Sequence, residues 1–352
     1  MKILAIESSC DETAAAVVEN GATALSNIVA TSHEMHEKYG GIVPEVAARK
    51  QLESIIPVIT EALTPLRKNN ESIYQTIADS VDAIAVTVGP GLIGSLLVGV
   101  ETAKTISMVT GIPLIPVNHV LAHMYANFVH DEQRNNVPIN FPAISLVVSG
   151  GHTELYLMES PDTVTWLGGT IDDAAGECFD KSARLLGFGH GGGLAIQEAA
   201  GKFKVKSSQF TVRLPRPMLD KENELNFSFS GLKTAILREV NKLKAENTFD
   251  DSAIQALSYE IQETITDVLV KKTFRAVERY GVNTILLSGG VSSNLRLREK
   301  FLTHDSKFMI HFPPVPLCTD NAAYIGSYAF FRGKQTPWQE ITAVPDLSVE
   351  SV

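Results

Sequence analysis

The chain has 352 residues, of which 44% are hydrophobic and 20% are charged. This is the composition of an ordinary folded globular protein, and it excludes a disordered or collagen-like chain. There are 30 lysines and arginines against 40 aspartates and glutamates, giving a net charge of −10. This balance excludes a basic nucleic-acid-binding arm. At this length we expect two or three domains, or one large bilobal α/β unit.

Two uncharged stretches, 83–100 and 105–130, have about the length of a membrane-spanning helix. The sequence Gly-Pro-Gly at 89–91 interrupts the first, and two prolines and two histidines interrupt the second, so neither predicts a membrane helix. The N-terminus reaches Glu7 too early for the apolar core of a secretory signal peptide. We therefore expect a cytoplasmic protein with no membrane partner.

The three cysteines, Cys10, Cys178 and Cys318, lie far apart and form no CxxC pair. The sequence therefore predicts neither a disulfide framework nor a structural zinc site. We expect reduced thiols. For Cys318, two residues before Asp320, we expect the role of a small buried hydrophobic side chain.

In chain order, apolar runs bounded by turn residues predict strands, and longer segments with helical spacing predict helices between them. The expected strands are residues 2–8, 13–19, 82–89, 113–118, 143–150, 153–159 and 284–290. The expected helices are residues 44–63, 94–110, 119–129, 174–187, 231–244, 252–280 and 294–303. Strands that alternate with helices favour an α/β fold.

Two parts of the chain follow one plan. Residues 3–18 and residues 144–158 each read as a strand, a short polar turn and a second strand, and a strand–helix unit with a glycine-rich junction follows each. Such a repeat predicts two lobes. We expect an N-terminal lobe of residues 1–118 plus 317–352 and a C-terminal lobe of residues 119–316.

Glycine-rich junctions between strands and helices occur at residues 89–95, 149–151, 189–193 and 288–294. Glycine lets the backbone approach an anion closely, and the free amides of the next helix start attract negative charge. Tight turns also need glycine. Four such loops in one chain favour a nucleotide or phosphate ligand over turn formation alone.

His119 and His123 have the i, i+4 spacing that puts two imidazoles on one face of a helix, where they could bind one metal ion. A carboxylate is the common third ligand of such an ion. Two hydrogen-bonded histidines at a helix start fit the residues equally well. A zinc protease of the HExxH type is disfavoured because Val120 occupies the place of its glutamate.

Several carboxylates lie at predicted turns and helix starts. They are Asp11, Glu12, Asp172, Asp173, Glu177, Asp180 and Asp320. Turn formation or helix N-capping explains each of these carboxylates as well as a catalytic or metal-binding role does. For Asp320, N-capping is the default. The residues alone therefore do not show which of these carboxylates belong to a functional site.

Nine ordered motifs of the chain match those of a known family. They are ESSCDET (7–13), HEKYGGIVPEVAARK (36–50), GPGLIGSLLVG (89–99), VNHVLAH (117–123), LVVSGGHT (146–153), DDAAGECFDKSARLLG (172–187), NFSFSGLKTA (226–235), LSGGVSSN (287–294) and CTDNAAYIG (318–326). From Met1 to about Phe331 the chain resembles the tRNA N6-adenosine threonylcarbamoyltransferase family of the bacterial TsaD type.

This resemblance implies an α/β fold of the bilobal actin/Hsp70/sugar-kinase-like (ASKHA) class with two duplicated subdomains. It implies one divalent ion, Fe²⁺ or Zn²⁺, at His119, His123 and Asp320, and catalytic roles for Asp11 and Glu12. The implied ligand is an adenine nucleotide or threonylcarbamoyl-adenylate. The positions implied to contact it are Val147, Val148, Ser149, Gly150, Gly151, Asp180, Gly193 and Asn294.

The implied activity is transfer of a threonylcarbamoyl group from threonylcarbamoyl-adenylate to N6 of the adenosine 3′ of the anticodon, in tRNAs that read codons beginning with A, with release of AMP. The implied partners are tRNA, a TsaB-like paralogue and a TsaE-like ATPase, and could include a second copy of the chain in a homodimer. Because a fold does not dictate chemistry, an ATPase or small-molecule kinase of the same fold is the alternative, and a metalloprotease a weaker one.

Two further segments bear on these expectations. The sequence GHGGGL at 189–194 stands where the family has a loop similar to GYPGGP, and the loss of two prolines is expected to loosen this loop. Lysines and arginines in 201–216 and 232–245 could form a local basic face for RNA, although a solvated helix surface explains them as well.

Overall fold

The computed structural model of the protein describes residues 1–32, 42–68, 71–130, 138–189, 192–203, 212–220, 224–304 and 307–350. The chain divides into two compact units. Unit 1 comprises Met1–Pro138, Pro161–Thr163 and Pro313–Val352, and unit 2 comprises Ile139–Ser160 and Val164–Phe312.

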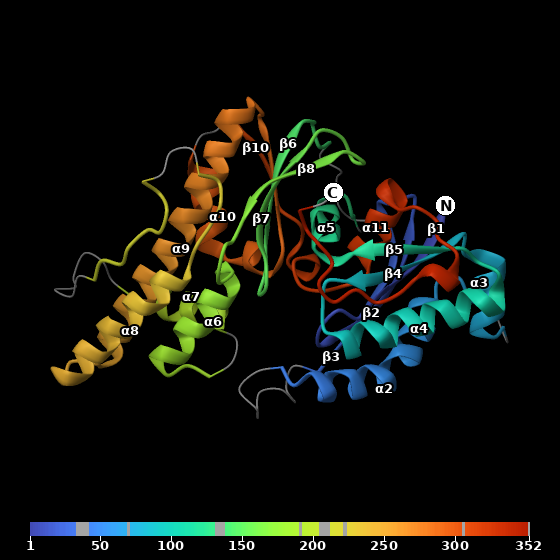
Figure 1. Ribbon diagram of the computed structural model, residues 1–352, viewed down its shortest axis with the longest axis horizontal. Coiled ribbons are helices and arrows are strands. Elements are labelled where there is room, and N and C mark those ends of the chain that lie inside the picture. Colours follow the sequence, from blue (N-terminus) through green and yellow to red (C-terminus); the bar gives the residue numbers. More distant parts are fainter. Residues whose placement is uncertain are drawn as a thin grey trace. The chain divides into compact units, whose positions relative to one another are not determined.

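Unit 1 is built around a five-stranded sheet (Figure 1). Its strands are β1 (Lys2–Glu7), β2 (Glu12–Glu19), β3 (Thr23–Thr31), β4 (Ala83–Gly89) and β5 (Leu114–Asn118). Its helices are α2 (Pro44–Ala62), α3 (Ile73–Ser80), α4 (Ile93–Thr110), α5 (His119–Ala122) and α11 (Ala323–Arg332), with short 3₁₀ helices η1 (His123–Asn127), η3 (Val315–Leu317) and η4 (Trp338–Glu340).

Unit 2 contains a second five-stranded sheet. Its strands are β6 (Ala143–Val148), β7 (Thr153–Met158), β8 (Val164–Gly169), β9 (Thr284–Ser288) and β10 (Met309–His311). Its helices are α6 (Ala175–Leu186), α7 (Gly192–Lys202), α8 (Ser230–Ala245), α9 (Asp251–Tyr280) and α10 (Leu295–His304), with the 3₁₀ helix η2 (Gly290–Ser293) before α10.

The two sheets have the same topology. The strand order is β3-β2-β1-β4-β5 in unit 1 and, from the corresponding edge, β8-β7-β6-β9-β10 in unit 2. In each, the first three strands in the chain form an antiparallel meander, and the last two pair in parallel. The duplicated plan expected from the two hairpins is therefore confirmed.

Alternating side chains of β1 face different helices. Leu4 and Ile6 belong to the apolar cluster that α2 and α4 complete on one side of the sheet. On the other side lies α11, whose Gly326 comes so close that a Cβ there would be 2.7 Å from Val18 Cγ2 and 3.3 Å from Ala5 Cβ (Figure 1). Such a close approach requires glycine.

The core of unit 2 lies between its sheet and its helices. Ile144, Leu146 and Val148 on β6 are fully buried in one apolar cluster with residues of α6, α8, α9 and α10, which Figure 1 shows on one side of the sheet. The long helix α9 starts where the Asp250 side chain accepts a hydrogen bond from the Ala253 N–H at 2.9 Å, and ends at Gly281, whose φ of 63° suits glycine.

Each expected strand and helix has a counterpart, with one change of type. The expected helix 119–129 is a four-residue α-helix followed by a 3₁₀ helix. Strands β3, β8 and β10 and helices α3 and α7 were not expected. The thiols agree with the expectation, since Cys10, Cys178 and Cys318 form no disulfide and Cys318 is fully buried.

The division into units differs from the expected lobe boundary after Asn118. Residues 119–130 belong to unit 1, because α5 starts directly at the end of β5 and packs with η1 against α11. Residues Pro161–Thr163 also belong to unit 1, where the Tyr125 hydroxyl donates to the Pro161 carbonyl at 2.6 Å. Within the described ranges, no helix is both long enough and apolar enough to cross a membrane.

Arg296 on α10 makes one ion pair with a largely buried glutamate, Glu263, and one with an exposed glutamate, Glu299. Glu263 on α9 accepts from its Nε at 2.6 Å and Nη2 at 3.1 Å, and also pairs with Lys300 Nζ at 3.0 Å. Burial by itself would raise the pKa of Glu263, but Arg296 and Lys300 outweigh it and lower this pKa below its ordinary value. Glu299, the other partner of Arg296, has a side chain that is 58% exposed.

We expect Glu263→Gln to reduce the free energy of unfolding at neutral pH by about 1.5–3 kcal/mol, since it weakens charge-assisted bonds. Glu299→Gln, the matched control, should cost about 0–1 kcal/mol. Because the pKa of Glu263 is lower in the folded state, its contribution is full at neutral pH and disappears as pH falls through the folded pKa. Denaturant unfolding at pH 7 and at about pH 3 should show the Glu263→Gln deficit shrinking; equal deficits for the two variants would contradict this.

Candidate metal centre

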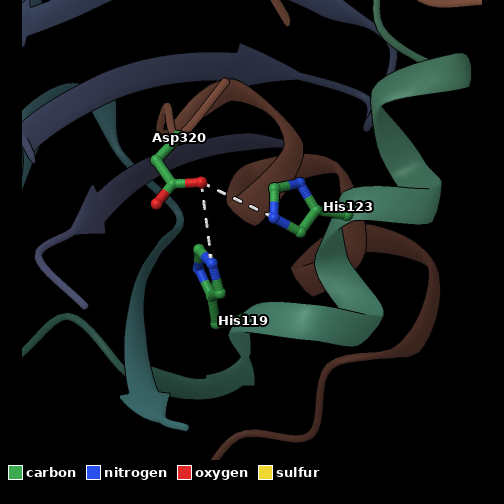
Figure 2. Close-up of side chains that lie close together, drawn as sticks. All are labelled: His119, His123 and Asp320. Carbon is green, nitrogen blue, oxygen red and sulfur yellow. Dashed lines mark ion pairs between the residues drawn. The ribbon is translucent and has the colours of Figure 1, made fainter. Parts of the chain in front are cut away.

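The start of helix α5 positions two imidazoles. Asn118 ends β5, and its side-chain oxygen accepts hydrogen bonds from the backbone N–H groups of Val120 at 3.0 Å and Leu121 at 3.3 Å. His119 is therefore the first residue of a capped turn, and His123 follows one turn later. Their ring centroids are 4.8 Å apart with planes at 72°. Both side chains lie on the same side of this turn (Figure 2).

Asp320, from the segment before α11, completes the group. Its Oδ1 lies 3.6 Å from His119 Nε2 and 3.5 Å from His123 Nε2 (Figure 2). One ligand atom from each residue lies within 4.8 Å of the others. Two ligand atoms bound tetrahedrally at about 2.1 Å from one ion would be roughly 3.4 Å apart. The three side chains are therefore close to the arrangement that a single ion requires.

The N-cap interpretation of Asp320 is wrong. Helix α11 starts at Ala323, and the Asn321 side-chain oxygen, not Asp320, accepts the hydrogen bond from the Ala323 N–H at 3.0 Å. The Asp320 carboxylate instead faces the imidazoles and accepts a hydrogen bond from the Tyr324 hydroxyl at 3.4 Å. The Tyr324 ring also lies 4.7 Å from that of His123.

Glu7 contacts the opposite edge of the His119 ring. Its Oε2 is 3.0 Å from His119 Nδ1, and the side chain is 1% exposed. The Thr87 hydroxyl donates to Oε2 at 2.6 Å, and the Ser9 N–H donates to Oε1 at 2.5 Å. Sequence reasoning missed this residue, although an acid at the end of a fully apolar strand run was a visible signal.

The centre carries more carboxylates than imidazoles. Burial opposes ionisation of Glu7 and His119, but their mutual attraction lowers the pKa of Glu7 and, with Asp320, raises that of His119 to about 9. Burial, together with the charges of Asp320 and Asp11, raises the pKa of Glu12 to about 10. Because negative charge accumulates in this buried place, a divalent cation would be bound favourably.

The hairpin tip that carries Asp11 and Glu12 is held on several sides. Gln51 on α2 donates to the carbonyl oxygens of Cys10 and Glu12, each at 3.0 Å. The Ser95 hydroxyl also donates to the Cys10 carbonyl at 2.8 Å. Asp11 is 8% exposed. The two acids are thus fixed in a largely buried turn of unit 1, rather than in a solvated one.

The residues expected to contact a nucleotide all belong to unit 2. Val147 and Val148 are fully buried at the end of β6, and Ser149, Gly150 and Gly151 form the turn to β7. The Ser149 N–H donates to the His152 carbonyl at 2.9 Å, which closes the turn. Both glycines are exposed, and a Cβ on either would meet no atom within 4 Å. The backbone of this turn is therefore open to a ligand.

Close backbone approaches bring two other glycine segments to this turn. The Gly176 N–H at the start of α6 donates to the Ser149 carbonyl at 3.2 Å, and a Cβ on Gly176 would lie 2.4 Å from that oxygen. A Cβ on Gly289, after β9, would lie 2.4 Å from the Val148 carbonyl oxygen. The turn, the start of α6 and the end of β9 thus meet at one edge of the sheet, where ligands of open α/β sheets usually bind.

Asp180, Gly193 and Asn294 extend the same region. Asp180 lies on α6 against the first turn of α7, where a Cβ on Gly192 would be 2.4 Å from its Oδ1, and Gly193 follows in that turn. Helix α7 reaches the start of α10 through Gln197, which accepts from the Leu295 N–H at 2.7 Å.

The Asn294 side chain has structural partners. Its oxygen accepts from the Leu297 N–H at 3.0 Å, and its amide donates to Gln262 Oε1 at 3.1 Å.

Two other expectations fall partly outside the described residues: the loosened loop, at residues 190–191, and the basic segment 201–216, at residues 204–211.

The comparisons with known sequences agree with each other. The family model described as TsaD, tRNA N6-adenosine threonylcarbamoyltransferase, matches residues 23–327. The chain belongs to the TsaD family. It is 46% identical over 354 residues to a protein of that name from Dehalococcoides mccartyi, with full coverage of both chains. It is 44% identical over 340 residues to the one from Persephonella marina, covering 96% of this chain and 91% of the relative.

Solved structures with little sequence identity share the fold. Full-length HypF in its phosphate- and nucleotide-bound form matches with a TM-score of 0.56 and 13% identity, over 94% of this chain and 46% of HypF. Component A of the Acidaminococcus fermentans (R)-2-hydroxyglutaryl-CoA dehydratase matches with a TM-score of 0.51 and 14% identity, over 94% and 98%. The expected ASKHA fold of this TsaD-family chain is thereby confirmed.

The donor set of this TsaD-family chain fits the expected ion. Imidazole nitrogens and a carboxylate oxygen suit both zinc and iron, and three protein ligands leave positions open for a substrate. Among the described residues, His119, His123 and Asp320 are the group of this kind that could hold a metal. Val120 stands where a zinc protease of the HExxH type would need its glutamate, and this apolar side chain is fully buried.

We expect the purified chain to bind about one Zn²⁺ or Fe²⁺, with its ligands supplied by these three side chains. His119→Ala, His123→Ala and Asp320→Ala should each reduce the bound metal to a small fraction of that amount, as measured by elemental analysis after dialysis. His304→Ala is the control, because its ring stacks on Phe274 in unit 2. Full metal content in His119→Ala and His123→Ala would contradict the assignment.

Proposed function

We propose that this chain transfers the threonylcarbamoyl group of threonylcarbamoyl-adenylate to N6 of the adenosine 3′ of the anticodon, in tRNAs that read codons beginning with A, and releases AMP. Membership of the TsaD family supports the reaction. The structural observation that supports it most directly is the convergence of His119, His123 and Asp320 on positions from which one ion can be bound.

Acyl transfer to an exocyclic amine needs help, because that amine is a weak nucleophile and charge develops on the attacked carbonyl oxygen. When bound, the divalent ion supplies Lewis acidity for such an oxygen. The side chains of unit 1 hold and orient its ligands. Asp11 and Glu12, fixed at the hairpin tip, are the candidates to accept the proton that N6 loses. Glu12, whose pKa is raised to about 10, takes this role only when a bound cation offsets the neighbouring negative charges.

We assign the adenylate to unit 2. The backbone of Ser149, Gly150 and Gly151 is open, and the N-terminus of α6 starts beside it at Ala175. Amides of such a turn and the positive end of a helix attract phosphate. In this proposal Val147, Val148, Asp180, Gly193 and Asn294 supply the remaining contacts to the adenylate. The AMP part of the substrate, which is the leaving group, is held there in this proposal.

The acidic character of the chain bears on its partners. With a net charge of −10, it neutralises few tRNA phosphates unless basic groups are gathered locally or supplied by another protein. We therefore include a TsaB-like paralogue and a TsaE-like ATPase among the partners. Because tRNA is the substrate, the proposal also places the protein in the cytoplasm.

Loss of the metal ligands should abolish the reaction. We expect His119→Ala and His123→Ala to lower the rate by on the order of 100-fold or more, since Lewis-acid stabilisation contributes several kcal/mol. The measurement is threonylcarbamoyladenosine in tRNA by nucleoside mass spectrometry, with partner proteins and the adenylate supplied and His304→Ala as the control. Undiminished product would reject the metal role. Steady ATP turnover by the chain without tRNA would instead favour an ATPase or kinase.

The nucleotide site can be tested separately. Gly176→Ala would bring a Cβ to 2.4 Å from the Ser149 carbonyl oxygen, so the turn must move. We expect the affinity for AMP to fall about tenfold, equivalent to about 1.4 kcal/mol. Gly201→Ala is the matched control, because its Cβ would meet no atom within 4 Å. Equal calorimetric affinities for the parent and Gly176→Ala would contradict a phosphate site at this turn.

A further inference from the structure

We propose that Glu7 is a positioning residue of the metal centre, which fixes the tautomer and the orientation of His119 so that Nε2 is presented to the ion. This inference rests on the metal centre of the proposed function. Glu7 is not a ligand in this arrangement, because it contacts the ring at Nδ1 and not at Nε2.

The position of the Glu7 carboxylate is determined by its own hydrogen bonds. Oε2 accepts from the Thr87 hydroxyl at 2.6 Å, and Oε1 accepts from the Ser9 N–H at 2.5 Å. The side chain is 1% exposed, so water does not compete effectively for these oxygens. Thr87 lies on β4, the parallel neighbour of β1. The acceptor that meets His119 is therefore held rigidly by two strands.

The chemistry of a carboxylate decides the tautomer. An ionised carboxylate only accepts hydrogen bonds, so its 3.0 Å contact with His119 Nδ1 requires a proton on that nitrogen. When the ring gives up its other proton to bind an ion, the lone pair is therefore on Nε2, which is the atom 3.6 Å from Asp320 Oδ1. The Ser9 hydroxyl, 3.3 Å from Nδ1, could donate or accept and does not select a tautomer. Glu7 is the group that does.

A carboxylate in this place also increases the basicity of the ligand. Removing such a partner from a metal-binding histidine typically lowers metal affinity or activity by 10- to 100-fold. Glu7→Gln keeps the size of the side chain but removes the charge. Its amide either accepts from Nδ1 more weakly or presents an N–H, which would favour the tautomer whose proton is on Nε2 and so oppose metal binding.

The test measures metal affinity directly and does not depend on activity. We expect Glu7→Gln to raise the Kd for Zn²⁺ by about 10- to 100-fold in competition titrations with a chelator, and to alter the visible absorption of the Co²⁺-loaded protein. Thr87→Val, which removes one donor to Glu7, should weaken Zn²⁺ binding to a smaller extent. Ser107→Ala is the control, because its buried hydroxyl donates to the Ile112 carbonyl at 2.7 Å, away from the metal ligands.

The outcomes separate a positioning role from a structural one. A structural role would lower the melting temperature of Glu7→Gln without changing the Zn²⁺ affinity or the Co²⁺ spectrum of the folded protein, and that result overturns the proposal. If Glu7→Gln does not fold, the Zn²⁺ affinity of Thr87→Val is the deciding measurement. An affinity equal to that of the parent chain then overturns the proposal. A parent chain that binds no ion at His119 and His123 overturns the metal centre and this role with it, whereas equal affinities of parent and variant overturn only the role of Glu7.

Discussion

The hydrogen bonds around the buried carboxylate of Glu7 connect the carboxyl ends of three neighbouring strands. Glu7 ends β1, Thr87 lies near the end of β4, and His119 follows β5 directly. Because β1, β4 and β5 are parallel, their ends lie at the same edge of the sheet. Burying a charge there costs free energy unless the charge is paired and hydrogen-bonded. The positions of these three elements are therefore tied together, and so is that of His119, one of the three side chains that could hold a metal ion.

The two units show how one plan can carry two kinds of side-chain chemistry. Each sheet has the same strand order, and each first hairpin places its tip beside helix starts. In unit 1 the tip carries Asp11 and Glu12, whose oxygens favour a cation. In unit 2 the corresponding tip carries Gly150 and Gly151, where exposed amides favour an anion. The two hairpin tips differ in chemistry because they carry different residues, whereas the sheets that support them have the same strand order.

Much of the fold was predictable because apolar runs and turn residues report burial. The missed strands lack that signal: β3 has partly exposed positions along its length, and β10 has three residues. The i, i+4 spacing found the two histidines but left a capping role open. It could not show that Asn321, and not Asp320, accepts the hydrogen bond from the Ala323 N–H, so that Asp320 is left to face the imidazoles. Glu7 was not found, because its partners lie 80 and 112 positions away.

The capped turn at the start of α5 limits how the length of the chain can vary. One helical turn separates His119 from His123, and each residue advances the helix by about 100°. An inserted or deleted residue between them would rotate one ring away from Asp320, and no neighbouring strand could compensate, since Asn118 fixes where the turn begins. Insertions that preserve the metal centre are therefore confined to other segments, such as loops distant from this edge of the sheet.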